Sequence, residues 1–171
     1  MYNKVDTNMN FVDREKETEK FWRENDIFKK SMENRKEGET YTFYDGPPTA
    51  NGKPHIGHVE TRTIKDMIPR FQTMKGKYVP RKAGWDTHGL PVEIEVEKQL
   101  NMSGKQDIEK YGIKEFNQKC RESVFTYTGM WREMSERMGY LVDLDNPYVT
   151  LENDYIETGW WILKKFFDEG L

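Results

Sequence analysis

Cysteine is nearly absent from this 171-residue chain, which contains only Cys120. An internal disulfide therefore cannot form, and a zinc site built from several cysteines is excluded. Because disulfides are rare in reducing compartments, a chain of this kind fits a cytoplasmic setting. Cys120 falls on an apolar helical stripe, so we interpret it as a packing residue and not as a nucleophile.

Long apolar runs are also missing. No segment approaches the roughly 20 consecutive apolar residues that a membrane-spanning helix needs, so we expect no membrane partner. The first ten residues, MYNKVDTNMN, lack the apolar core of a cleaved secretory signal. The 9 Phe, 9 Tyr and 5 Trp nevertheless provide enough apolar surface for a core, which argues against a disordered chain.

The formal net charge is −3, but the charges are unevenly distributed. Residues 1–40 carry 9 positive and 10 negative side chains, residues 41–90 carry 8 and 4, and residues 91–171 carry 10 and 16. The basic middle segment also contains all three histidines and five of the seven prolines. Such a segment can attract a polyanion such as a nucleotide. An excess of this size is equally compatible with ordinary surface variation.

Apolar periodicity and turn residues predict a helix-rich chain with two readable strands. Asn10 is the expected N-cap of the first helix. Pro69 should kink or end its helix near Ile68. The longest helix is expected over 113–138, where apolar residues recur every three or four positions. The full prediction places helices at 11–30, 56–74, 92–100, 113–138 and 153–169, strands at 41–44 and 78–83, and loops at 34–38, 45–52 and 84–91.

The most informative feature is a strand, a loop rich in glycine and proline, and a helix that begins with His55 and His58. Two histidines three residues apart in the first turn face the same side. Unpaired backbone N–H groups and the helix dipole stabilise a phosphate at a helix N-terminus. Each imidazole can also donate to a phosphate oxygen. Gly57 would let a flat ring such as adenine lie on the backbone, and Lys53 adds a positive charge.

Other interpretations of this histidine pair are weaker. The P-loop and the G-x-G-x-x-G fingerprint are both absent. Zinc is not supported, because a third ligand would have to be Asp86 or His88 and the cysteine lies far away in the sequence. Two surface histidines without a function would be the default for the pair alone. The preceding loop and the helix that follows favour a nucleotide site.

Two segments resemble those of class I aminoacyl-tRNA synthetases. Residues 48–58 (PTANGKPHIGH) resemble the HIGH element, and residues 84–93 (GWDTHGLPVE) resemble the next block of the isoleucine, leucine and valine subgroup, in its isoleucyl form. HIGH alone is moderately specific, because other nucleotidyltransferases carry related sequences. The two blocks at this spacing are strongly specific. The first helix and residues 143–149 are also similar to the isoleucyl enzymes, so the resemblance covers almost the whole chain.

The resemblance implies an α/β fold, namely a helix-rich, partial Rossmann-like (HUP-type) nucleotide-binding half with few parallel strands. Residues 1–40 would form an N-terminal helical extension. Residues 41–171 would form the first half of the catalytic domain, truncated before the editing insertion. The family's KMSKS loop, editing domain and anticodon-binding helices are not in these 171 residues. We therefore expect this segment to be inactive alone.

The resemblance also implies ATP-dependent activation of isoleucine to isoleucyl-adenylate and transfer to tRNA(Ile), with Mg²⁺ accompanying ATP. The attacking carboxylate is already ionised, so catalysis reduces to alignment and charge stabilisation. His55 and His58 would be the catalytic phosphate donors. The implied ATP-binding residues are Pro48, Asn51, His55, Gly57 and His58. The implied amino-acid-binding residues are Gly46, Pro47, Asp86 and His88, with Asp86 pairing with the substrate ammonium.

Two other functions are compatible with the same residues. One is a small HxGH-type nucleotidyltransferase that is active on its own, and the other is a non-catalytic, synthetase-like binding module. The acidic C-terminal part argues weakly against a module that binds tRNA tightly. For the first reading we expect a monomer whose partners are isoleucine, ATP and, through the full-length enzyme, tRNA(Ile).

Overall fold

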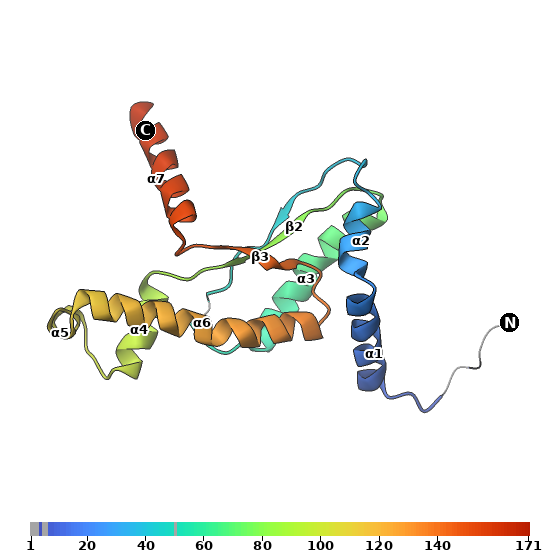
Figure 1. Ribbon diagram of the computed structural model, residues 1–171, viewed down its shortest axis with the longest axis horizontal. Helices are drawn as coiled ribbons and strands as arrows, with labels where there is room; N and C mark the ends of the chain where they lie inside the picture. Colours follow the sequence, from blue (N-terminus) through green and yellow to red (C-terminus); the bar gives the residue numbers. More distant parts are fainter. Residues whose placement is uncertain (1–3, 5–6, 50) are drawn as a thin grey trace.

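The computed structural model describes residue 4, residues 7–49 and residues 51–171. In this part of the chain, seven helices accompany a parallel sheet whose strand order is β1-β2-β3 (Figure 1). The strands are β1 (Phe43–Tyr44), β2 (Arg81–Trp85) and β3 (Asp143–Val149). The helices are α1 (Phe11–Glu24), α2 (Ile27–Glu33), α3 (Ile56–Met74), α4 (Leu90–Gln99), α5 (Lys105–Tyr111), α6 (Ile113–Arg137) and α7 (Asn153–Asp168). The expected helix-rich α/β fold, a partial Rossmann-like half, is confirmed.

The two strands predicted from the sequence pair in parallel. Phe43 lies opposite Arg81 and Tyr44 opposite Lys82, and an isolated bridge between Thr40 and Tyr78 precedes them. β2 begins and ends later than predicted, because Gly84 and Trp85 continue it and do not start the next loop. The loop predicted over 45–52 is confirmed except at Ala50, which lies outside the described residues.

The sequence prediction missed β3, which pairs with the other edge of β2. Its first half looks like a turn, because the Asp143 carboxylate accepts the backbone N–H groups of Asp145 and Asn146, both at 3.1 Å. The register shifts between Lys82 and Gly84, which accommodates this turn-like segment. Pro147 is tolerated because, among the described strands, β3 is an edge strand that pairs with β2 alone.

Gly84 is required by the side chain that crosses it. A Cβ atom at this position would lie 2.2 Å from Cζ of Tyr148, well inside van der Waals contact. The Tyr148 hydroxyl in turn donates to the backbone oxygen of Asp45, at the end of β1. The tyrosine therefore spans the sheet from β3 to β1 across the backbone of Gly84.

Pro69 does not end α3 near Ile68, because the helix continues to Met74. A proline inside a helix costs about 3 kcal/mol, but the turn after it is held by tertiary hydrogen bonds. Arg81 donates to the Thr73 hydroxyl at 2.8 Å, and Arg35 donates to the Thr73 oxygen at 2.7 Å. Long-range contacts of this kind cannot be read from local sequence.

The long helix α6 matches its prediction closely, and Gly139 follows it with a φ of +72°. Its apolar stripe packs on β2 and α4 through a cluster of buried residues, Trp85, Val92, Val124 and Trp131. Cys120 packs against this cluster, and burial raises the pKa of its thiol. The interpretation of Cys120 as a packing residue is therefore confirmed. The short helix α5 was not predicted.

The N-terminal helix predicted over 11–30 is two helices. Asn10 caps α1 as expected, accepting from Val12 N at 3.0 Å. Asp26 has a φ of +50°, a left-handed conformation that separates α1 from α2.

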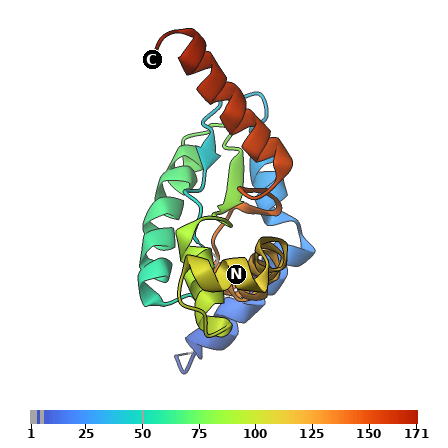
Figure 2. The ribbon, with the colours of Figure 1, turned by 90° about the vertical axis from the view of Figure 1, so that its left-hand side faces the viewer.

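At the other end of the chain, α7 extends away from the sheet (Figures 1 and 2). Its Trp160 and Phe167 are 68% and 77% exposed. None of the helices in the described residues meets the length and apolarity of a membrane span.

We predict that Gly84→Ala lowers the free energy of unfolding by about 1–3 kcal/mol, because the added methyl group overpacks the Tyr148 ring. Gly129→Ala is the matched control, since a Cβ atom there meets nothing within 4 Å and lies inside α6. That change should stabilise the chain by about 0.5–1 kcal/mol. Urea unfolding followed by circular dichroism measures both. Equal effects of the two changes would contradict the assigned role of Gly84.

Candidate functional site

Two histidine side chains cap the N-terminus of α3. Nδ1 of His55, the N-cap residue, accepts the N–H of Gly57 at 3.2 Å. Nδ1 of His58 accepts the N–H of His55 at 3.1 Å. The two rings stack with their centroids 3.7 Å apart. This reciprocal arrangement is a capping box built from imidazoles.

These hydrogen bonds determine where the imidazole protons lie. A ring nitrogen that accepts an N–H group carries no proton, so in the neutral form of each ring the proton is on Nε2. Partial burial, together with the neighbouring His55 and Arg62, lowers the pKa of His58, so this ring is neutral at pH 7. Each ring therefore keeps one donor, Nε2–H, for a ligand.

The expectation that bare helix amides bind the phosphate is wrong for His55 and Gly57, because their N–H groups are already bonded to the imidazoles. The structure explains why residue 57 is a glycine. A Cβ atom at this position would lie 3.1 Å from Cε1 and 3.2 Å from Nδ1 of the His55 ring. Glycine here lets the His55 ring reach the helix end.

A cavity of about 580 Å³ opens beside this helix end. That volume is in the range of small-molecule sites. Five residues predicted for the site line it: Gly46, Pro48, Asn51, His55 and His58. The charged side chains among its described lining residues are Lys53, Arg62 and Lys65, all cationic. The cavity is therefore suited to an anionic ligand.

A buried carboxylate organises two of these cations. Asp45 is 1% exposed, and its Oδ1 lies 2.7 Å from Nζ of Lys65. Its Oδ2 lies 3.7 Å from Nη1 of Arg62. Lys65 also donates to the Gly46 oxygen at 3.1 Å. One carboxylate facing two cations leaves a positive excess at the cavity wall.

Asp86 lies next to the loop that lines the cavity, although it does not line the cavity itself. Its N–H donates to the Pro48 oxygen at 3.0 Å, and the Thr49 hydroxyl donates to its Oδ2 at 3.3 Å. A parallel bridge between Thr49 and Asp86 extends the pairing of β1 with β2. Asn51 donates to the Pro91 oxygen at 3.5 Å. The two sequence blocks singled out by their motifs are thus held together at the carboxyl ends of β1 and β2.

His88, Pro47 and Gly57, all predicted site residues, lie outside the cavity lining. Nδ1 of His88 is 2.6 Å from the Thr150 hydroxyl, which also accepts from the N–H of Thr87 at 3.0 Å. His88 is therefore tied to the end of β3. In the described residues no group of three or more His, Cys, Asp or Glu side chains is arranged to hold a metal ion.

Sequence reasoning missed four cavity residues that lie outside the two motif segments: Thr61, Arg62, Lys65 and Trp131. The first three follow His58 on one face of α3, so helical spacing could have identified them. Trp131 lies on α6, and its sequence position predicted only a place in the apolar stripe of that helix. No residue near it in the sequence indicates contact with the histidines.

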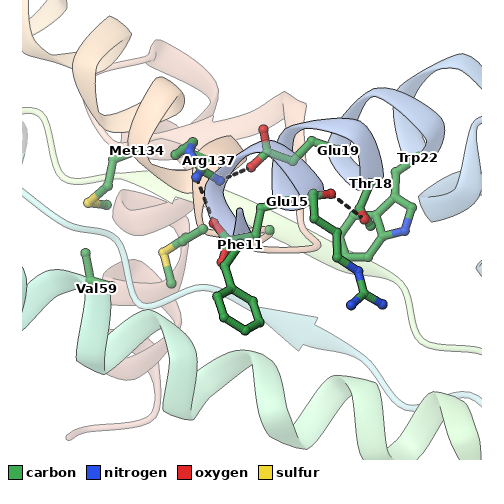
Figure 3. A pocket seen from close by; sticks show the side chains of 11 residues that line it. Phe11, Glu15, Thr18, Glu19, Trp22, Val59, Met134 and Arg137 are labelled. Carbon is green, nitrogen blue, oxygen red and sulfur yellow. Dashed lines mark hydrogen bonds and ion pairs between the residues drawn. The ribbon is translucent and has the colours of Figure 1, made fainter. Parts of the chain in front are cut away.

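A second cavity, of about 650 Å³, lies between α1, α3 and α6 (Figure 3). Phe11, Trp22, Val59 and Met134 give it a mostly apolar lining, and Arg137 pairs there with glutamates of α1 (Figure 3). None of the predicted site residues lines it. Its apolar character does not suit the phosphate chemistry expected for the histidines.

We predict that His55→Ala lowers the free energy of unfolding by about 0.5–2 kcal/mol, because the N-cap acceptor is lost. His55→Asn should retain most of the stability, since asparagine is among the best N-cap residues. Urea unfolding of the two variants measures the difference. If both variants were equally unstable, the capping role of the His55 ring would be contradicted.

The family model described as tRNA synthetases class I (I, L, M and V) matches residues 17–171. Isoleucine–tRNA ligases of Clostridium acetobutylicum and Clostridium kluyveri are 58% and 60% identical over 171 residues, which is 100% of this chain and 16% of each relative. The isoleucine–tRNA ligase of Thermus thermophilus is 59% identical over 162 residues, 95% of this chain and 16% of the relative.

The fold has a solved counterpart in a LeuRS of Agrobacterium radiobacter K84, determined in a ternary complex with tRNA and LeuAMS. The TM-score is 0.64 at 20% identity, over 92% of this chain and 18% of that one. The chain spans about a sixth of the length of the relatives that it matches. The family match covers most of the chain, including both motif segments, and the chain therefore belongs to the class I tRNA synthetases of the I, L, M and V group.

Proposed function

We propose that this chain is the part of an isoleucine–tRNA ligase that binds the ATP phosphates and the amino group of isoleucine. The observation that carries the proposal is the cavity at the start of α3. Two imidazoles with available Nε2 donors and three cationic side chains line it, and Asp86 lies beside its loop. The full enzyme activates isoleucine with ATP and transfers the acyl group to tRNA(Ile).

The cavity matches the needs of the activation step. The carboxylate of isoleucine attacks the α-phosphorus of ATP, pyrophosphate leaves, and no general base is required because the carboxylate is already ionised. Charge on the phosphate oxygens must be stabilised instead. His55 and His58 donate through Nε2, while Arg62, Lys65 and Lys53 supply positive charge. Mg²⁺ would enter with ATP as part of the substrate.

The remaining predicted residues keep their proposed roles around this centre. Gly57 supports adenine, while Pro48 and Asn51 hold the loop against the nucleotide. Asp86 pairs with the substrate ammonium, and its bond from Thr49 keeps its carboxylate near the nucleotide loop. Gly46 and Pro47 line the side-chain pocket. His88, held by Thr150, acts indirectly by shaping the loop after β2.

The topology supports the proposal that the 171 residues alone are inactive. In doubly wound sheets a ligand binds where the strand order reverses. Among the described strands β1 lies at an edge of the sheet, so only β2 flanks the site and no strand lies on the other side of β1. In this proposal residues 1–40 are an extension, residues 41–171 are the first half of the catalytic domain, and the full enzyme is a cytoplasmic monomer. Turnover of ATP or CTP by the 171 residues alone would instead favour a small nucleotidyltransferase.

We predict that His55→Asn or His58→Ala in the full-length protein lowers the kcat of isoleucine-dependent ATP–pyrophosphate exchange by about 100- to 1000-fold, as expected for loss of one preorganised donor. The asparagine variant separates phosphate donation from helix capping, because it keeps the cap. Exchange at the wild-type rate in both variants would remove the histidines from the phosphate site.

We predict that Asp86→Asn raises the KM for isoleucine by about 10- to 100-fold, because a charge-assisted hydrogen bond to the ammonium is lost. The KM for ATP should change little, since the backbone N–H of residue 86 still bonds to Pro48. The same exchange assay, with each substrate varied in turn, measures both constants. A rise in the ATP constant alone would place Asp86 outside the amino-group site.

A further inference from the structure

We propose that Trp131 is a positioning residue for the phosphate site, acting through His58 and through the carbonyl of Gly52. The inference rests on the proposed function, because it concerns the same cavity. Trp131 belongs to α6 and is 2% exposed, yet its indole reaches the cavity wall.

The first contact of Trp131 is with the loop. Its Nε1–H donates to the Gly52 oxygen at 2.9 Å. Loop residues 45–52 contain two prolines and two glycines and form no regular strand pairing at Gly52. This hydrogen bond attaches the loop to a long, buried helix immediately before the chain enters Pro54 and His55. The position of the N-cap therefore depends on a donor from α6.

The second contact is with the imidazole of His58. The two ring centroids are 4.4 Å apart at an interplanar angle of 52°. The His58 ring also stacks on His55, with the centroids 3.7 Å apart. The imidazole thus contacts two rings, while its Nδ1 accepts the N–H of His55. This arrangement leaves Nε2 as the free donor and restricts its direction.

A third contact places a cavity cation on the same indole. Cζ of Arg62 lies 5.4 Å from the centroid of the Trp131 ring, within cation–π range. A side chain that served only the core would not need to touch the loop, a phosphate donor and a cation of one cavity. Asp86, by contrast, is attached to the loop through Pro48 and Thr49, so Trp131 should govern the ATP side of the site and not the amino-acid side.

Two substitutions separate the contacts of Trp131. Trp131→Phe keeps a ring beside His58 but removes the donor to Gly52. Trp131→Leu removes both. In the full-length protein, isoleucine-dependent ATP–pyrophosphate exchange should show kcat/KM for ATP about 3- to 10-fold lower in the Phe variant, the range expected for one hydrogen bond. The Leu variant should lose more, while KM for isoleucine stays unchanged in both.

Val124→Ala is the matched control, because Val124 is 1% exposed on the same helix and in the same apolar cluster but does not line the cavity. It should lower stability and leave the kinetic constants for both substrates unchanged. Hydrogen–deuterium exchange followed by mass spectrometry provides a second measurement. Uptake in peptides covering residues 46–58 should rise in both Trp131 variants and not in Val124→Ala.

Wild-type kinetics for ATP and unchanged uptake in the Phe variant would overturn the inference, and so would an equal effect of Val124→Ala. If the Leu variant fails to fold, the Phe variant decides. If the wild-type protein shows no isoleucine-dependent exchange, the proposed function fails. In that case the uptake comparison still determines whether Trp131 holds the loop and the start of α3.

Discussion

The start of α3 depends on two hydrogen bonds in which imidazole nitrogens accept backbone N–H groups. They place His55 and His58 in contact, satisfy two of the amides that a helix leaves unpaired, and leave one N–H donor on each ring. The glycine between the histidines is part of this arrangement, because a larger residue would crowd the His55 ring. The motif is therefore a helix cap, and the same bonds leave one donor on each ring available to a ligand.

Electrostatics and backbone pairing complete the site around this cap. Asp45 is buried against Lys65 and Arg62, so the two cations are held in place by a carboxylate that does not itself line the cavity. The pairing of Thr49 with Asp86 brings a carboxylate close to this positive region without placing it inside the cavity. The cations of α3 and the Asp86 carboxylate after β2 thus present charges of opposite sign near the same loop.

Much of this architecture could be predicted from the sequence where the signal is local. Asn10 as an N-cap, the long stripe of α6 and the loop before His55 all follow from residue types within a few positions. The errors arise where distant residues override the local signal. The turn after Pro69 is held by arginines from other elements, and β3 forms at a sheet edge despite a turn-like sequence. Trp131 could not be assigned to the site, because its contacts with the loop come from tertiary packing alone.

The imidazole cap has a further consequence for the behaviour of the site in acid. An Nδ1 atom that accepts a backbone N–H can bind a proton only by giving up that bond. In His58, whose pKa is lowered by partial burial and by the neighbouring His55 and Arg62, protonation and capping therefore compete for the same lone pair. Protonation of His58 would break its bond from the N–H of His55 and at the same time add a positive charge at the edge of the cavity, so the first turn of α3 is coupled to the charge of this ring.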